Sequence, residues 1–149
     1  MAVEVGDKAP DFELVDQHGT PVRLSSLRGR RIVLLFYPLA FSRICGGELT
    51  AIRDEFAAPD DVRVLTVSVD SMFSHRVWAD QEGYTFSLLS DFWPHGAVAR
   101  AYGVFDEEKG VALRGTFIID AEGVVRWKIV NEIGSARDAG AYQKALDDI

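Results

Sequence analysis

The sequence predicts an α/β fold in which one sheet is covered by helices. Two segments, 32–37 and 62–69, are typical of long strands. The first is rich in β-branched and aromatic residues and lacks polar alternation, as expected for a strand buried on both faces. Each is followed by a segment with helical spacing, and a hairpin pattern lies near the end of the chain at 116–130. This order of elements favours a single domain, residues 1–149, built on one sheet.

The first third of the chain is expected to begin with a small hairpin. Residues 12–14 and 22–24 alternate in polarity and flank the turn residues 16–19. Residues 25–29 are typical of one helical turn that ends at a glycine. A longer helix is expected to begin after Ser42 and to pack through four apolar residues near one stripe: Ile44, Leu49, Ile52 and Phe56.

Glycines, prolines and charged turns divide the rest of the chain into short elements. In order, we expect a helix at 73–82, a short strand at 86–89, a helix at 97–102, strands at 116–119 and 124–130, and a final helix at 138–146. The loop at 90–96 carries an unusual share of aromatic residues.

The composition argues against several classes of function. Of the 149 residues, 48% are hydrophobic, which is enough for a packed core, and the net charge of −7 argues against a nucleic-acid partner. The longest uncharged apolar run, 32–41, is about half the length of a membrane span, so no membrane partner is expected. A single cysteine excludes an internal disulfide, and the N-terminus has no apolar signal segment. We therefore expect a cytoplasmic protein.

The single cysteine, Cys45, occupies a position that favours reactivity. A lone cysteine is most often a small buried hydrophobic residue. Cys45, however, lies outside the apolar stripe predicted above and falls in the first turn of the helix, with Ser42 as the N-cap. Unpaired backbone N–H groups and the helix dipole favour a negative charge there, and the thiolate is the nucleophilic form of a thiol.

The other residues of the chain restrict the reactions that the Cys45 thiol can support. A disulfide oxidoreductase needs a second thiol, and the chain has none. A cysteine hydrolase needs a histidine base, but His18, His75 and His95 have no spacing that requires a Cys–His pair, and the same residues show no metal-ligand spacing. Reversible oxidation of one thiolate to a sulfenic acid, with reduction by an outside thiol, remains.

Several segments resemble one family, the peroxiredoxins. Residues 38–45, PLAFSRIC, match its signature of proline, three residues, threonine or serine, two residues and cysteine. The segments APDFEL, SDFWPHGAVARAYGVF and RGTFIID also look like that family, and in particular like its one-cysteine members of the alkyl hydroperoxide reductase E type. The resemblance implies a thioredoxin-like fold: a central mixed sheet flanked by helices, with an N-terminal hairpin.

The resemblance also implies roles for four residues. Cys45 matches the cysteine whose thiolate attacks the peroxide, and Arg114 matches the arginine that holds the thiolate and polarises the O–O bond. Ser42 stands where the family places a hydroxyl that hydrogen-bonds the substrate, although threonine is commoner there. Pro38 matches the proline that shields the sulfenic acid. Each also has a plainer interpretation: a solvated charge for Arg114, an N-cap for Ser42, and a strand terminator for Pro38.

Four further residues are expected to support the site. Glu48 can pair with an arginine such as Arg114 or Arg137, or lie on the surface. Trp93 and Phe41 are assigned to the pocket, although Trp93 can equally pack beside it. Outside this set, His95 is interpreted as a helix cap, and no cofactor or metal is expected.

The resulting function is a thiol-dependent peroxidase of hydrogen peroxide and organic hydroperoxides. Its second partner is an external low-molecular-weight thiol or redoxin, because the chain has no resolving cysteine. A peroxide-sensing redox adaptor and a disulfide-handling or glutathione-transfer protein are the alternatives. A homodimer is also expected, on the family and on aromatic residues that a small domain leaves partly exposed: Phe73, Trp78, Phe92 and Trp93.

Overall fold

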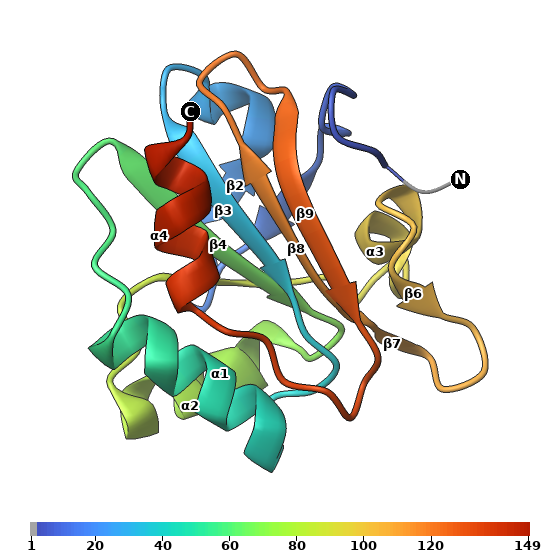
Figure 1. Ribbon diagram of the computed structural model, residues 1–149. Helices are drawn as coiled ribbons and strands as arrows, with labels where there is room; N and C mark the ends of the chain where they lie inside the picture. The colour runs from blue at the N-terminus through green and yellow to red at the C-terminus, as the bar shows by residue number, and fades with distance from the viewer. Residues whose placement is uncertain (1–2) are drawn as a thin grey trace.

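The computed structural model describes residues 3–149 and is built on a five-stranded mixed sheet with the strand order β5-β4-β3-β8-β9 (Figure 1). Strands β3, β4 and β5 are parallel, whereas β8 runs antiparallel to β3, and β9 antiparallel to β8. This confirms the α/β prediction and the mixed sheet that the resemblance implied.

The elements follow one another closely along the chain. The strands are β1 (Glu13–Val15), β2 (Pro21–Arg23), β3 (Arg31–Phe36), β4 (Val62–Ser68), β5 (Ser87–Ser90), β6 (Phe105–Asp106), β7 (Val111–Ala112), β8 (Arg114–Ile119) and β9 (Val125–Asn131). The helices are the 3₁₀ turn η1 (Leu24–Leu27), α1 (Arg43–Asp54), α2 (Met72–Glu82), α3 (Ala97–Ala101) and α4 (Gly140–Asp147). Strands β1 and β2 form the expected N-terminal hairpin.

Alternation along β3 divides the core into two layers. Val33, Leu35 and Tyr37 face one layer, which contains buried residues of α1, α2 and α4. Ile32, Leu34 and Phe36 face the other, which contains residues of α3, β2 and η1. Because successive side chains of a strand point to opposite faces, β3 is covered on both sides, which explains why residues 32–36 are all apolar.

Helix α1 begins where the sequence predicts but packs through a different stripe. Ser42 is its N-cap, with an extended backbone, and the buried residues of the helix are Cys45, Glu48, Leu49 and Ile52. These positions follow the i, i+3, i+4, i+7 spacing of one helix face. Cys45 therefore lies on the buried stripe, and the expectation that it lies outside is wrong. The expected stripe member Ile44 is only partly buried.

Candidate active site

The loop from Pro38 to Ser42 joins the end of β3 to the start of α1 and delivers Cys45 into the molecule. It lies at the carboxyl ends of the parallel strands, where open α/β sheets place their ligand sites. The Ser42 Oγ accepts a hydrogen bond from the Cys45 N–H at 3.4 Å. This N-cap fixes the first turn of α1 around the thiol.

The thiol of Cys45 is fully buried and has one charged donor. Cys45 is 0% exposed. The Nη1 of Arg114, the first residue of β8, donates to its Sγ at 3.2 Å. The Arg114 Nε donates to the carbonyl oxygen of Ile133 at 2.6 Å, which fixes the plane of the guanidinium group. The guanidinium group and the start of the helix thus both place positive potential at the sulfur.

A carboxylate joins that guanidinium group to a second one. Glu48, one turn along α1 from Cys45, accepts a hydrogen bond from Arg114 Nη1 through its Oε1. The Arg137 Nε and Nη2 donate to the two Glu48 oxygens, each at 2.8 Å, so this pair is bidentate. We call Glu48, Arg114 and Arg137 the arginine cluster. All three are less than 10% exposed.

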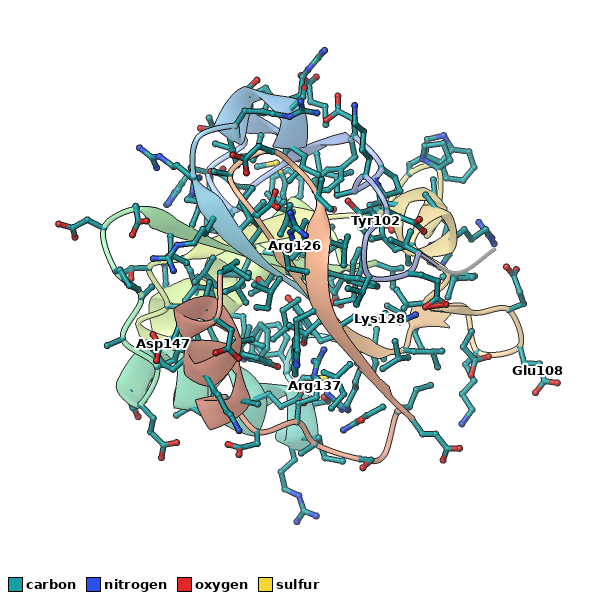
Figure 2. The ribbon with its side chains drawn as sticks, turned by 45° about the horizontal axis from the view of Figure 1, so that its top comes forward. Tyr102, Glu108, Arg126, Lys128, Arg137 and Asp147 are labelled. Carbon is teal, nitrogen blue, oxygen red and sulfur yellow. The ribbon has the colours of Figure 1, made fainter. Side chains whose placement is uncertain are left out.

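Arg137 also connects this cluster to the sheet. Its Nη1 donates to the carbonyl oxygens of Phe36 at 2.7 Å and of Gly115 at 2.9 Å, on the adjacent strands β3 and β8. Figure 2 shows Arg137 inside the molecule, whereas Glu108 points outward from the β6–β7 turn. Every part of the Arg137 guanidinium group thus has a partner, as a buried charge requires.

The charges within the arginine cluster do not cancel. Arg114 and Arg137 contribute two positive charges, and Glu48 contributes one negative charge. Burial alone would raise the pKa of Glu48, but hydrogen bonds and charge from Arg137, with the charge of Arg114, bring that pKa below its ordinary value. Glu48 is therefore ionised at neutral pH, and the cluster keeps one net positive charge beside the Cys45 sulfur.

A pocket of about 340 Å³ lies against this site. Its walls are mainly apolar, and Arg114 connects it to the thiol. The residues that line it are Pro38, Leu39, Ser42, Arg43, Ile44, Arg114, Ile133 and Gly134. Pro38 and Ser42 therefore lie where a molecule in the pocket meets the Arg114 guanidinium group.

A second buried polar group holds the middle of the loop. The Oδ2 of Asp70 accepts hydrogen bonds from the Ala40 N–H at 2.8 Å and from the Ser68 Oγ at 2.6 Å. His75 Nε2 lies 2.7 Å from the Ser68 Oγ. The single hydroxyl proton of Ser68 goes to Asp70, so His75 Nε2 carries a proton and donates it to Ser68. We call Ser68, Asp70 and His75 the serine cluster.

The backbone conformation of Phe41 explains why the loop needs the hydrogen bond from Ala40 to Asp70. Phe41 has a φ of 68°, in the left-handed region that a side chain with a Cβ seldom adopts. Its ring packs on Trp78 at 5.8 Å between ring centroids. The Asp70 bond to the Ala40 N–H fixes the residue just before this unfavourable conformation and thereby helps to fix the loop that carries Pro38 and Ser42.

Several expectations about aromatic residues and His95 are wrong. Trp93 is 80% exposed and is absent from the pocket lining, and Phe41 packs on Trp78 instead of lining the pocket. Trp78 is buried, so it adds nothing to an exposed surface. His95 does not cap α3: its Nε2 contacts the Gly110 carbonyl oxygen, and the Asp91 carboxylate accepts from the Val98 and Ala99 N–H groups.

Sequence reasoning missed the serine cluster and Arg43. Ser68 is the last residue of β4 and Asp70 follows it. This position was the one available signal, because side chains at the carboxyl end of a strand meet the loop of the neighbouring parallel strand. Among residues 3–149, no group of three or more histidine, cysteine or acidic side chains is placed to hold a metal ion. Within the same residues, no helix has the length and apolar character to cross a membrane.

A mixed sheet that delivers one thiol to a helix start, beside a buried guanidinium group, defines a cysteine-based redox protein of the thioredoxin-like class. Comparison with known proteins is consistent with this class. Residues 5–128 match the AhpC/TSA family. The chain is similar to alkyl hydroperoxide reductase E of Mycobacterium tuberculosis (strain ATCC 25618 / H37Rv), with 47% identity over 97% of this chain and 96% of the relative.

Further relatives agree. A putative peroxiredoxin of Synechocystis sp. is 38% identical over 99% of this chain and 78% of its own length. Among solved structures, AhpC of Enterococcus faecalis superposes with a TM-score of 0.88 at 32% identity, covering 99% of this chain and 92% of that one. The chain therefore belongs to the AhpC/TSA family, the peroxiredoxins.

Proposed function

We propose that this protein is a one-cysteine, thiol-dependent peroxidase that reduces hydrogen peroxide and organic hydroperoxides, and that residues 1–149 act as one domain. The observation that carries the proposal is the 3.2 Å contact between Arg114 Nη1 and Cys45 Sγ beside a pocket lined by Pro38 and Ser42. The family supports the same reaction class, since its relatives are named as peroxiredoxins and alkyl hydroperoxide reductases.

In the oxidative step, the Cys45 thiolate attacks one peroxide oxygen in line with the O–O bond. The S–O bond forms as the O–O bond breaks, and the electron pair of that bond leaves on the second oxygen. This oxygen takes up one proton and departs as water or an alcohol, and Cys45 becomes a sulfenic acid. Arg114 stabilises the negative charge that moves from sulfur to the leaving oxygen, with its guanidinium group already oriented by Ile133 and Glu48.

The other residues act around this displacement. The Ser42 hydroxyl hydrogen-bonds a peroxide oxygen, and Pro38 limits the access of a second peroxide to the sulfenic acid. Glu48 and Arg137 position Arg114 through the bonds described above. Because Cys45 is 0% exposed, the residues around the pocket must shift slightly when the substrate reaches the sulfur.

The reductive step requires thiols from outside the chain, because Cys45 is its only cysteine. The first thiol attacks the sulfenic sulfur, forms a mixed disulfide with Cys45 and releases water. A second thiol attacks the mixed disulfide, which restores the Cys45 thiol and releases the oxidised reductant. The proposed reductant is a redoxin or a low-molecular-weight thiol, and the compartment proposed for this cycle is the cytoplasm, where such thiols are kept reduced.

Stopped-flow oxidation tests the proposal. Reduced protein is mixed with one equivalent of hydrogen peroxide, and we follow thiol loss, capture by a sulfenic-acid trap and intact mass. We expect oxidation far faster than that of free cysteine, the trapped adduct on Cys45, and no such reaction in the Cys45→Ser variant. Oxidation at the rate of free cysteine would overturn the proposal.

A second stage of the experiment separates turnover from sensing. The oxidised protein is supplied with a panel of small thiols and with thioredoxin- or glutaredoxin-type proteins, and peroxide consumption is followed over many cycles. Turnover with any member supports the peroxidase. Rapid oxidation without turnover on every member supports a redox sensor instead.

The protein is further proposed to work as a homodimer. Phe73, Phe92 and Trp93 are 69%, 55% and 80% exposed, and large apolar side chains at the surface are typical of association sites. Light scattering at micromolar concentration, in the reduced and oxidised states, should return the mass of two chains. The mass of one chain in both states would refute the dimer.

A further inference from the structure

One charged side chain of the pocket has no part in the peroxide chemistry described above. Arg43 lines the pocket together with Pro38, Leu39 and Ile44, and it is exposed. It takes part in none of the ion pairs formed by residues 3–149. Its guanidinium group is therefore available to an anion at the mouth of the pocket.

Helix stability gives no reason for a cation at this position. Arg43 is the first residue of α1, directly after the N-cap Ser42, and the first turn holds no acidic residue. The helix dipole places a partial positive charge there, so a cation is less favourable than a neutral side chain. A residue that opposes local stability at the rim of a reactive site suggests a role in binding.

The rest of the pocket is suited to an apolar molecule. Pro38, Leu39, Ile44 and Ile133 form its walls, and no aspartate or glutamate lines it. Arg114 is already engaged by Cys45, Glu48 and the Ile133 carbonyl. The volume of about 340 Å³ lies at the lower end of the range for pockets that hold small organic ligands and far exceeds the needs of hydrogen peroxide.

The net negative charge of the chain increases the contribution of Arg43 to the attraction of anions. A net charge of −7 repels anions from most of the surface, whereas a local positive charge at a pocket mouth raises their concentration there. Arg43 thus gives the mouth of this pocket a positive charge, in contrast to the net negative charge of the chain.

We propose that Arg43 binds the anionic group of an organic hydroperoxide whose apolar body fills the pocket. The site then favours a negatively charged organic hydroperoxide over a neutral one of similar shape. The inference rests on the proposed peroxidase function, because the bound molecule is the substrate of Cys45. The bonds formed and broken are those given above, and Arg43 contributes only to binding and to the approach of the substrate.

A matched pair of substrates tests this inference. Cumene hydroperoxide and its para-carboxylate share the reacting group and the aromatic body and differ in one negative charge. The second-order rate constant for Cys45 oxidation is measured by stopped flow with each, and their ratio is divided by the same ratio for free cysteine. We expect this normalised ratio to exceed one in the native protein and to fall as salt rises from about 20 mM to about 500 mM, because salt screens exposed charges.

Variants assign the effect to Arg43. In Arg43→Gln the normalised ratio should fall about 1.5- to 5-fold, which corresponds to the range measured for exposed ion pairs, and in Arg43→Glu it should fall further. Arg30→Gln is the control, because Arg30 is also exposed and precedes β3 at the end remote from the pocket. The ratio in this control should match that of the native protein.

Each outcome decides the question. A normalised ratio of one, a ratio that salt leaves unchanged, an unchanged ratio in Arg43→Gln, or an equal fall in Arg30→Gln would each overturn the assignment. Hydrogen peroxide, measured on the native protein in the same apparatus, keeps the two proposals apart. If it oxidises Cys45 rapidly while the ratio is one, the peroxidase stands and the role of Arg43 fails; if it does not, the peroxidase itself fails.

Discussion

The arginine cluster and the serine cluster are both polar groups beside the carboxyl end of β3, yet they are built on different principles. In the arginine cluster every charged group has an opposite charge in contact, and one guanidinium touches the reacting sulfur. The serine cluster contains one carboxylate and a neutral histidine whose Nδ1 lacks a hydrogen-bond partner among residues 3–149, and it binds the loop through the Ala40 N–H. The comparison suggests a division of labour: the first sets the charge at the sulfur, and the second sets the shape of the loop.

The largest expected effect comes from removing the charge at the centre of the arginine cluster. Glu48→Gln leaves two buried guanidinium groups without their common carboxylate, so the free energy of unfolding should fall by about 3 to 5 kcal/mol. Urea unfolding measures this. Glu55→Gln, at an exposed position at the end of the same helix, should change it by less than about 0.5 kcal/mol. A loss below about 1 kcal/mol in Glu48→Gln would show that the cluster does not depend on charge balance.

The next effect concerns the rate of oxidation. Arg114→Gln removes the one cationic donor to the sulfur, and loss of such a donor costs about 100- to 1000-fold in rate. Arg114→Lys keeps the charge but loses the planar fork that contacts Glu48 and Ile133 together, so its rate should lie in between. The second-order rate constant with hydrogen peroxide gives both values. A native rate in Arg114→Gln would remove Arg114 from the catalytic role.

The serine cluster should make the stability of the folded protein sensitive to acid, through His75. Burial lowers the pKa of His75 from 6.5 to about 4, although the charge of Asp70 acts in the opposite direction. Between these values the unfolded chain binds the proton and the folded chain does not. Stability is therefore unaffected by His75 above about pH 6.5 and falls as the pH drops towards 4, by on the order of 3 kcal/mol in all.

Other titratable groups also lower the stability in acid, so a variant is needed to separate the contribution of His75. Glu48 also has a lowered pKa, and its contribution disappears as it is protonated in acid. His75→Gln keeps a side-chain N–H for Ser68 and has no charge to gain. The unfolding free energy of this variant, measured by urea at several pH values between 7 and 4.5, should fall less steeply than that of the native protein. Parallel curves would show that His75 is not held neutral by the fold.

The smallest effect is expected from the link between the serine cluster and the loop. Asp70→Ala frees the Ala40 N–H, so Pro38 and Ser42 lose their fixed positions, and peroxide oxidation should slow by about tenfold, the equivalent of one charge-assisted hydrogen bond. Asp70→Asn keeps one oxygen acceptor and should recover part of the rate. Asp80→Ala, at an exposed position of α2, is the control.

A second measurement distinguishes positioning by Asp70 from general damage. Alkylation of Cys45 by iodoacetamide depends on the thiolate but not on the alignment of Ser42 with a peroxide. If Asp70 positions the loop, peroxide oxidation should slow more than alkylation does. Equal losses in both reactions would indicate a structural role alone.

The sequence was sufficient for the fold because the relevant signals are local. The apolar run at 32–37 predicts a buried strand, glycines end helices, and Ser42 in front of a helix predicts an N-cap, which is where the structure places it. The stripe of α1 was misjudged because Glu48 and Cys45 are polar or reactive residues that the tertiary structure buries. Hydrophobic spacing alone cannot show that a carboxylate will find two guanidinium partners.

The site itself was only partly predictable, because its members come from distant elements. Arg114 and Arg137 lie 69 and 89 residues from Cys45 and Glu48, respectively. The resemblance to a family indicates Arg114, whereas Arg137 is suggested only as an arginine with which Glu48 can pair. Trp93 was assigned to the pocket on aromatic character, but exposure depends on how its loop packs. Asp70 was overlooked because its partner is a backbone N–H, which no pattern of side chains can reveal.

The position of Arg114 within β8 limits how the length of this chain can vary. Thr116 pairs with Leu35 of β3 and shares a face with Arg114, whereas a Cβ on Gly115 would point to the opposite face and lie 2.8 Å from a Val104 methyl group. An insertion or deletion of one residue between Arg114 and Thr116 would turn the guanidinium group away from the sulfur. Length changes in the β6–β7 turn or in the β8–β9 turn would leave it in place. Related chains can therefore differ in length at these turns, while the three residues that begin β8 must keep their number.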